Sequence, residues 1–120
     1  MTVTEYLREH LHTRMGIVDH ISPEPVGNLE ISEWDYRFET LCRNRLIMGA
    51  IRYGRMGALD KPQWDRIPDM IRRLKEYSRT HNEELLVDVS NLCQLEFVEG
   101  KHVDKHFKSV DDGQHTKRKV

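Results

Sequence analysis

Three oxygen-bearing side chains recur along one segment of the chain at helical spacing. Glu84, Asp88 and Asn91 stand at i, i+4 and i+7, so a helix would place them on one side within about two turns. Their neighbours are Leu, Val, Cys and Phe, and a carboxylate in such surroundings needs a cation or strong hydrogen-bond donors. Asp88 is therefore expected to hold a metal ion, an arginine or a ligand.

Two interpretations of this acidic face stay open. Carboxylate and amide oxygens suit hard cations such as Mg²⁺, and Glu84 and Asp88 would then be the metal-binding residues. Alternatively, Asp88 forms a structural ion pair with an arginine while Glu84 is exposed to solvent. If the protein is an enzyme, Glu84 and Asp88 are also its candidate catalytic residues.

A second group of residues could bind a phosphate. Arg45, Arg52 and Arg55 lie close to one face of a predicted helix, with Tyr53 beside them. Guanidinium groups match phosphate and carboxylate oxygens, and a guanidinium or a tyrosine ring can stack on a base. The alternative is a solvated face, or a set of partners for Asp88 and Glu84. The predicted ligand-binding set is Arg45, Arg52, Tyr53, Arg55, Asp88 and Asn91.

The histidines near the end of the chain carry a weaker signal. His102 and His106 are four residues apart, a spacing that can bind zinc on a helix, and His115 follows. Gly100 and Lys101 predict a loop start, however, and no cysteine lies close. Surface histidines or contacts with a ligand's phosphate are the favoured interpretation, and the sequence assigns none of the three a role.

The elements that would position these residues are helices. Capping signals, apolar periodicity and glycine stops predict helices at 2–15, 33–55, 65–79 and 80–99, and a short helical turn at 103–110. Turn-forming residues predict a connecting segment at 17–31 and a turn at 111–113. No segment alternates with the period of a strand. We therefore predict an all-α fold, an antiparallel array of about four main helices.

Particular residues make this prediction specific. The capping signals are Thr2 with Glu5, Ser32 with Asp35, and Thr80 with Glu83, and the predicted helix terminators are Gly57 and Gly100. The third helix should bury one apolar face made of Ile67, Met70, Ile71, Leu74 and Tyr77. Its opposite, solvated face would hold Arg66, Asp69, Arg72, Arg73 and Glu76.

The composition fits one cytoplasmic domain over residues 1–120, with core helices at 32–99 between an N-terminal part at 1–31 and a C-terminal tail at 100–120. Charged residues make up 32% and apolar residues 38% of its 120 residues, which suits a small core. A net charge of −1 argues against a nucleic-acid polymer as partner. No apolar run reaches the ~20 residues that span a membrane, and no signal peptide heads the chain. Cys42 and Cys93 are interpreted as buried free thiols.

The sequence Ala50-Ile51-Arg52-Tyr53-Gly54, followed by the acidic segment from Glu84 to Asn91, resembles small phage-encoded proteins related to the all-α MazG-like nucleotide pyrophosphohydrolases. The resemblance covers residues 34–99. It implies Mg²⁺-dependent cleavage of nucleoside triphosphates to monophosphate and pyrophosphate, with pockets between helices of different chains in an oligomer. The family's enzymes use two acidic pairs. Glu84 and Asp88 match the second pair with one residue too many between them, and the first pair is missing.

This degenerate acidic motif beside an arginine stripe favours binding over hydrolysis. We expect a protein that binds a small nucleotide or cyclic nucleotide, such as a phage protein that sequesters host immune signalling nucleotides in the host cytoplasm. One alternative is a Mg²⁺-dependent nucleoside triphosphate pyrophosphohydrolase. The other is a protein-interaction module without a small-molecule ligand, suggested by segment 17–31. A homo-oligomer is expected, with no membrane partner.

Overall fold

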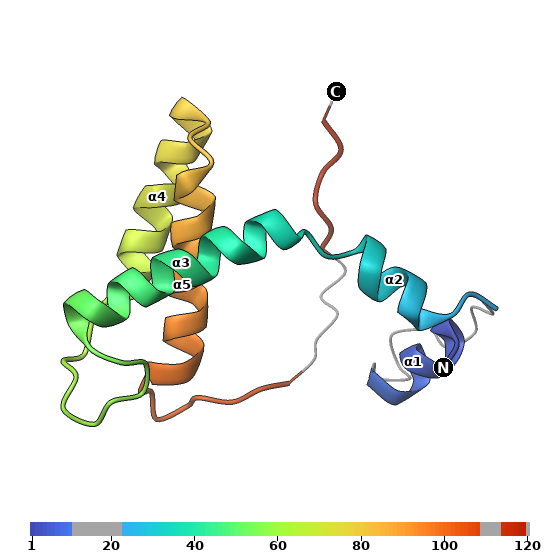
Figure 1. Ribbon diagram of the computed structural model, residues 1–120, viewed down its shortest axis with the longest axis horizontal. Helices are drawn as coiled ribbons and strands as arrows, with labels where there is room; N and C mark the ends of the chain where they lie inside the picture. The colour runs from blue at the N-terminus through green and yellow to red at the C-terminus, as the bar shows by residue number, and fades with distance from the viewer. Residues whose placement is uncertain (11–22, 109–113, 120) are drawn as a thin grey trace. The chain divides into compact units, whose positions relative to one another are not determined.

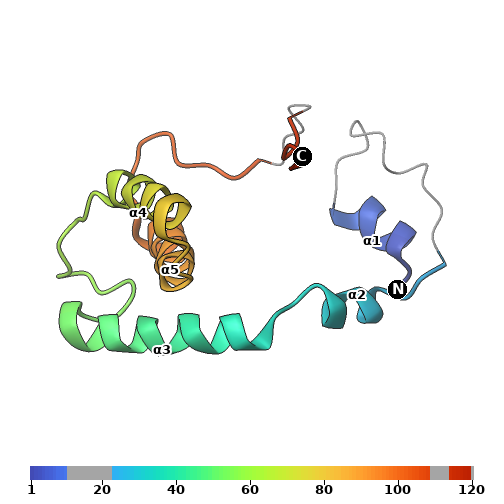
Figure 2. The ribbon, with the colours of Figure 1, turned by 90° about the horizontal axis from the view of Figure 1, so that it is seen from above.

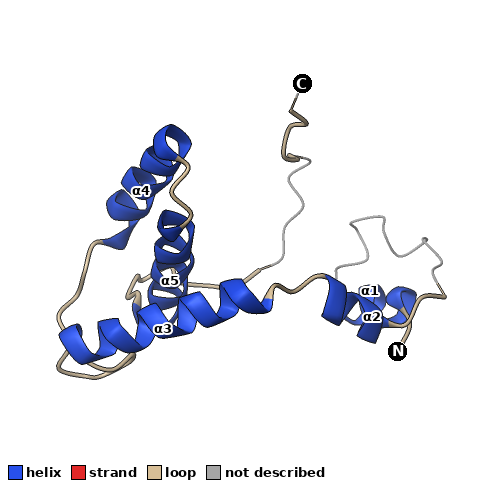
Figure 3. Cartoon of the chain, turned by 45° about the horizontal axis from the view of Figure 1, so that its top comes forward, coloured by secondary structure: helices blue, strands red, loops and turns tan. Residues whose placement is uncertain are grey.

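The computed structural model describes residues 1–10, 23–108 and 114–119. Every regular element in these residues is a helix, and apart from an isolated bridge between Thr2 and Pro25 they contain no β-structure (Figure 3). The all-α prediction is therefore confirmed. No helix among the described residues is long and apolar enough to cross a membrane.

Contacts divide the chain into two compact units, Met1–Trp34 with Asp104–Val120, and Asp35–Val103. The first unit holds α1 (Val3–His10) and α2 (Val26–Ser32). The predicted capping box opens α1: the backbone N–H of Thr2 donates to Glu5 at 3.0 Å, and that of Glu5 donates to the Thr2 hydroxyl at 3.3 Å. Residues 11–15 of the predicted first helix lie outside the described residues.

Helix α2 corrects the prediction of a loop throughout 17–31. Pro25 precedes it with a φ of −67°, which suits the start of a helix, and Val26 is buried. Gly27 and Asn28 are residues typical of turns, but both lie inside this helix. The error arose because turn-forming residues bias a segment only weakly, and packing of a neighbouring apolar residue can override them.

The second unit contains α3 (Tyr36–Tyr53), α4 (Arg66–Thr80) and α5 (Glu84–Glu99). Helices α4 and α5 form an antiparallel hairpin joined at residues 81–83 (Figure 1). Helix α3 packs on α5 and lies across the hairpin (Figure 2). The predicted antiparallel arrangement therefore describes α4 and α5, whereas α3 crosses them.

Several predicted helix boundaries were displaced by a few residues. Ser32 ends α2, and α3 begins after Asp35, whose carboxylate accepts from the N–H of Phe38 at 2.8 Å. Thr80 ends α4, and its hydroxyl donates to the carbonyl of Glu76. Gly54, with a φ of 100°, ends α3 in place of Gly57.

The end of the second unit follows the prediction only in part. Gly100 ends α5 as predicted, and a Cβ there would lie 2.5 Å from the carbonyl oxygen of Glu96. Residues 103–108 form no helix, so the predicted helical turn at 103–110 is wrong for these residues. Residues 109–110 and the predicted turn at 111–113 lie outside the described residues.

The predicted buried face of α4 is correct only in part, because Met70 and Tyr77 are half-buried whereas its other three residues are not. Ile67, Ile71 and Leu74 are exposed, each at nearly half of the full side-chain area. The side of α4 that faces α5 instead carries Arg66, which is buried, and Arg73, which is half-buried. The carboxylates of α5 explain this choice, because they pair with these cations and offset the cost of burying them.

The cysteine prediction holds in part. Both thiols are free, and Cys42 is half-buried. Cys93 is exposed, so its predicted burial is wrong. It lies on α5 with its sulfur 3.5 Å from that of Met70.

Candidate functional site

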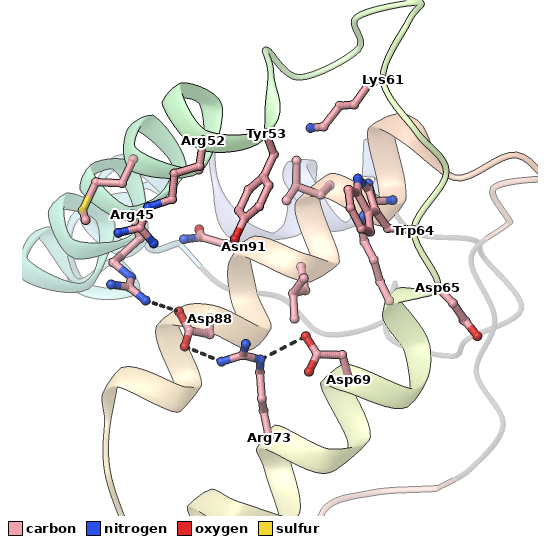
Figure 4. Close-up of a pocket in the computed structure, with 15 residues that line it drawn as sticks. Arg45, Arg52, Tyr53, Lys61, Trp64, Asp65, Asp69, Arg73, Asp88 and Asn91 are labelled. Carbon is pink, nitrogen blue, oxygen red and sulfur yellow. Dashed lines mark hydrogen bonds and ion pairs between the residues drawn. The ribbon is translucent and has the colours of Figure 1, made fainter.

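A cavity of ≈ 520 Å³ lies where the three helices of the second unit meet (Figure 4). Its walls are the C-terminal half of α3, the segment 61–65, the first half of α4 and the middle of α5. A volume of this order is typical of small-molecule sites. The predicted ligand-binding residues that line it are Arg45, Arg52, Tyr53, Asp88 and Asn91. Arg55 is exposed and is not part of the wall.

Asp88 lies between two arginines on different helices. Its Oδ2 accepts from Nη1 of Arg73 on α4 at 2.7 Å, and its Oδ1 lies 3.5 Å from Nη2 of Arg45 on α3. Of the three partners that the sequence left open, arginine is the one to which this carboxylate is bound here. Asp88 therefore acts as a shared counter-charge that holds two guanidinium groups at the cavity wall (Figure 4).

Glu84 extends the same ion-pair network. Its Oε1 lies 3.0 Å from Nη2 of Arg45, so both candidate metal-binding carboxylates contact one guanidinium group. In the described part of the chain, no three His, Cys, Asp or Glu side chains cluster as a metal site would require. A cation bound by Glu84 and Asp88 would have to displace Arg45 first.

Arg73 and Asp69 are site residues that the sequence did not indicate. Arg73 was assigned to the solvated face of its helix, but it lines the cavity and bonds both Asp88 and Asp69, the latter at 3.1 Å through Nε. Burial raises the pKa of Asp69, but bonds from Arg72 and Arg73 outweigh this and keep the pKa below its usual value. The spacing of Asp69 and Arg73 at i, i+4 was the available signal.

A buried charge cluster lies beside the cavity and fixes its connecting segment. Glu99 accepts from Lys61 at 2.9 Å, from the backbone N–H of Gly57 at 2.8 Å, and from Arg66. The exposed side-chain fractions of Lys61, Arg66 and Glu99 are 9%, 5% and 7%. Burial raises the pKa of Glu99, but the Gly57 N–H and the two cations outweigh it and lower the pKa. This charge cluster anchors residues 57–66 to the end of α5.

Arg52 differs from the other cations of the cavity wall. Lys61 and three arginines each contact at least one carboxylate: Arg45, Arg66 and Arg73. Arg52 contacts none within ion-pair distance in the ranges that the structure describes, and its side chain is exposed. The cavity therefore carries one guanidinium whose charge the protein does not balance locally.

Asn91 ties α3 to α5. Its Nδ2 donates to the backbone carbonyl of Cys42 at 3.0 Å. This hydrogen bond assigns the nitrogen and the oxygen of the side-chain amide. The residue is 7% exposed, and its Oδ1 has no hydrogen-bond partner among the described groups. An acceptor buried in this way costs about 1–3 kcal/mol, a cost that a donor from a ligand or a water would relieve.

An aromatic pair completes the wall. The rings of Tyr53, at the end of α3, and Trp64, in the segment before α4, meet edge to face with centroids 6.1 Å apart. Both rings line the cavity. Local sequence patterns indicate Tyr53 but not Trp64, because nothing local shows that a tryptophan eleven positions later (64 − 53) returns to the same place.

The histidines do not form a zinc site in the described residues. His102 contacts the Glu96 carboxylate at 3.0 Å, whereas His106 contacts the backbone oxygen of Asp104. The hydrogen bond with His102 is the main cause that lowers the pKa of Glu96, against burial, which raises it. Within the ranges that the structure describes, His115 forms no hydrogen bond or ion pair that would indicate a role.

The chain matches no protein-family model, and no curated protein or solved structure is significantly similar to it.

Proposed function

We propose that the protein binds a small phosphorylated nucleotide ligand in the cavity between α3, α4 and α5. The observation that carries this proposal is Arg52, the cavity cation without a carboxylate partner among the described residues. A guanidinium group binds phosphate oxygens through charge-assisted, bidentate hydrogen bonds. A phosphorylated ligand would therefore supply the missing charge.

The other cations support such a site in a different way. Arg45 and Arg73 are held by Asp88 at the wall, so their positions are set before a ligand arrives. The Arg45 contact is long at 3.5 Å, and its side chain is 39% exposed, so its remaining N–H groups are open to a second acceptor. Preorganised donors lower the entropic cost of binding.

This arrangement favours binding without hydrolysis. Two-metal hydrolysis needs several carboxylates that hold cations and position water. Here Glu84 and Asp88 are engaged by Arg45, and Asp88 also by Arg73. A MazG-like, phage-encoded protein of this kind would act in the host cytoplasm by sequestering immune signalling nucleotides, and Mg²⁺-dependent pyrophosphohydrolysis is the enzymatic alternative.

Replacing Arg52 by glutamine is expected to weaken nucleotide binding about 10- to 100-fold, because charge-assisted hydrogen bonds contribute about 1.5–3 kcal/mol. A thermal-shift screen of nucleotides and cyclic nucleotides would find the ligand, and calorimetry would measure the affinity. Arg55→Gln is the matched control, since Arg55 is an exposed arginine outside the cavity wall. Equal losses in both variants, or no stabilisation by any nucleotide, would refute the proposal.

A second candidate function, self-association, is favoured by the exposed apolar side of α4. Ile67, Ile71 and Leu74 follow each other at i, i+4 and i+7 and are 48%, 49% and 47% exposed. Such a continuous stripe is typical of an interface. This candidate is compatible with nucleotide binding, because an oligomer would keep the cavity of each copy.

Replacing Ile71 by aspartate is expected to shift a homo-oligomer towards monomer, because burying a carboxylate in an apolar interface is costly. Light scattering after size-exclusion chromatography measures the mass of each species. Leu59→Asp is the control, since Leu59 is 99% exposed and lies in the segment between α3 and α4. A wild-type protein that is monomeric at all concentrations would remove this candidate.

A further inference from the structure

We infer that the ligand's base stacks on Trp64 while its phosphate lies at Arg52, so that Trp64 is the base-binding residue. This inference rests on the proposed nucleotide function and adds the ligand's orientation. It also adds Trp64, which lies in the segment between α3 and α4 and not on a helix that holds the predicted site residues. Three observations support it: the geometry of the aromatic pair, the anchoring of Trp64, and the distribution of charge across the cavity.

The two rings of the aromatic pair meet edge to face and do not form parallel walls. The planes of Tyr53 and Trp64 meet at 67°, with centroids 6.1 Å apart, so a base cannot be sandwiched between them. It can lie flat on the indole of Trp64 with the tyrosine ring along its edge, an arrangement that aromatic quadrupoles favour. The indole is available for this contact because Trp64 is 48% exposed and lines the cavity.

Trp64 is held by its neighbours on both sides of the sequence. Lys61 and Arg66 are both bound to Glu99 at the end of α5, so the chain around the indole is tied to that helix at two points. An exposed aromatic ring on an anchored segment is preorganised for contact with a flat ligand. Trp64 is 48% exposed, so its contacts with the protein leave much of the residue open to a ligand.

The guanidinium group of Arg52, unpaired among the described residues, and the indole of Trp64 lie at different parts of the cavity wall. Arg45 and Arg52 project from α3, whereas Trp64 lies across the cavity near the start of α4 (Figure 4). Leu92 and Leu95 of α5 also line the wall, so the site is apolar as well as charged. A nucleotide has the same division, with an anionic phosphate at one end and an aromatic base at the other.

The chain makes Trp64 directly observable. It contains two tryptophans, and Trp34 belongs to the other compact unit. In a Trp34→Phe background, Trp64 is the remaining source of indole fluorescence. The probes are the 5′-monophosphates of adenosine, guanosine, cytidine and uridine, with ribose 5-phosphate as the base-free control and adenosine as the phosphate-free control.

We expect the tightest-binding monophosphate to quench the Trp64 fluorescence and ribose 5-phosphate to leave it unchanged. Trp64→Leu should weaken binding of that monophosphate about 10- to 100-fold, the range for loss of one stacked base, without changing the affinity for ribose 5-phosphate. Trp64→Phe should restore most of the affinity, because it keeps an aromatic face. Circular dichroism would confirm that both variants are folded.

The outcomes separate this inference from the proposed function. If calorimetry shows that a monophosphate binds and Arg52→Gln weakens it, but Trp64 fluorescence and Trp64→Leu affinity are unchanged, the stacking inference is wrong and the binding function stands. If Trp64→Leu weakens ribose 5-phosphate equally, Trp64 has a structural role and the inference is also wrong. If no monophosphate binds, the stacking inference fails; the proposed function fails with it if the thermal-shift screen of nucleotides and cyclic nucleotides also finds no ligand.

Discussion

Replacing Glu99 by glutamine is expected to lower the free energy of unfolding by about 3–5 kcal/mol, the range for breaking a buried ion pair. Glu99 neutralises both Lys61 and Arg66, and all three side chains are at least nine-tenths buried. The glutamine oxygen can accept one of these bonds, but the buried Lys61 loses its counter-charge and Arg66 keeps only the more distant Glu96, at 3.3 Å. Urea denaturation of wild type and variant, followed by circular dichroism, measures the loss.

Glu39→Gln is the matched control for this experiment. Glu39 forms an ion pair with Arg43 at 2.8 Å, but the Arg43 side chain is 73% exposed. Exposed pairs contribute about 0–1 kcal/mol. A loss of similar size in both variants would show that the buried charge cluster does not stabilise the connecting segment as its burial indicates.

The same charge cluster predicts how stability depends on pH. The pKa of Glu99 is lowered in the folded protein, so its carboxylate contributes stability that is fully present above the pKa of an unfolded glutamate, about 4.3. This contribution is lost as the pH falls through the lower, folded-state pKa. Wild type should therefore lose more stability than Glu99→Gln when both are acidified below pH ~4.

Replacing Asp88 by asparagine is expected to lower the free energy of unfolding by about 1.5–3 kcal/mol, since a charge-assisted bond to Arg73 is lost and the amide nitrogen faces a second cation. The variant also separates the two interpretations of this carboxylate. If Asp88 is a counter-charge for arginines, the metal-free protein is destabilised. If it is chiefly a metal ligand, the metal-free protein is unchanged or stabilised.

Thermal unfolding with and without Mg²⁺ provides the measurement. For a counter-charge, the difference between wild type and Asp88→Asn is the same in EDTA and in millimolar Mg²⁺. For a metal ligand, Mg²⁺ raises the Tm of wild type only. Glu84→Gln is the control, because its partner is the same Arg45 but its side chain is 54% exposed, so a smaller loss is expected.

Local patterns predicted the helices of the second unit well because their start and stop signals are local. Gly100 ends α5, as the sequence predicts. Boundaries moved where two capping residues competed, as at Ser32 and Asp35. The short helix α2 was missed because Gly27 and Asn28, which lie inside it, are residues typical of turns.

The candidate site was predictable only within single helices. Arg45 and Arg52 share a helix, as do Asp88 and Asn91, and helical spacing placed each pair on one face. Arg73 and Trp64 were missed because they reach the cavity through tertiary packing, which no local pattern encodes. The apolar pattern of α4 was misleading as well, because ion pairs with α5 place its charged side inward.

Helix α3 forms one wall of the cavity, and it is attached to the other walls less directly than they are attached to each other. Helices α4 and α5 are neighbours in sequence and form a hairpin, whereas α3 packs on α5 through contacts that include the Asn91–Cys42 bond and the long Arg45–Asp88 contact. Separation of α3 would therefore open the cavity without unfolding the hairpin, as a local opening event. The residence time of a bound ligand would then be set by the rate at which α3 detaches. In that case, ligand binding would slow amide hydrogen exchange in α3 and leave exchange in the α4–α5 hairpin unchanged.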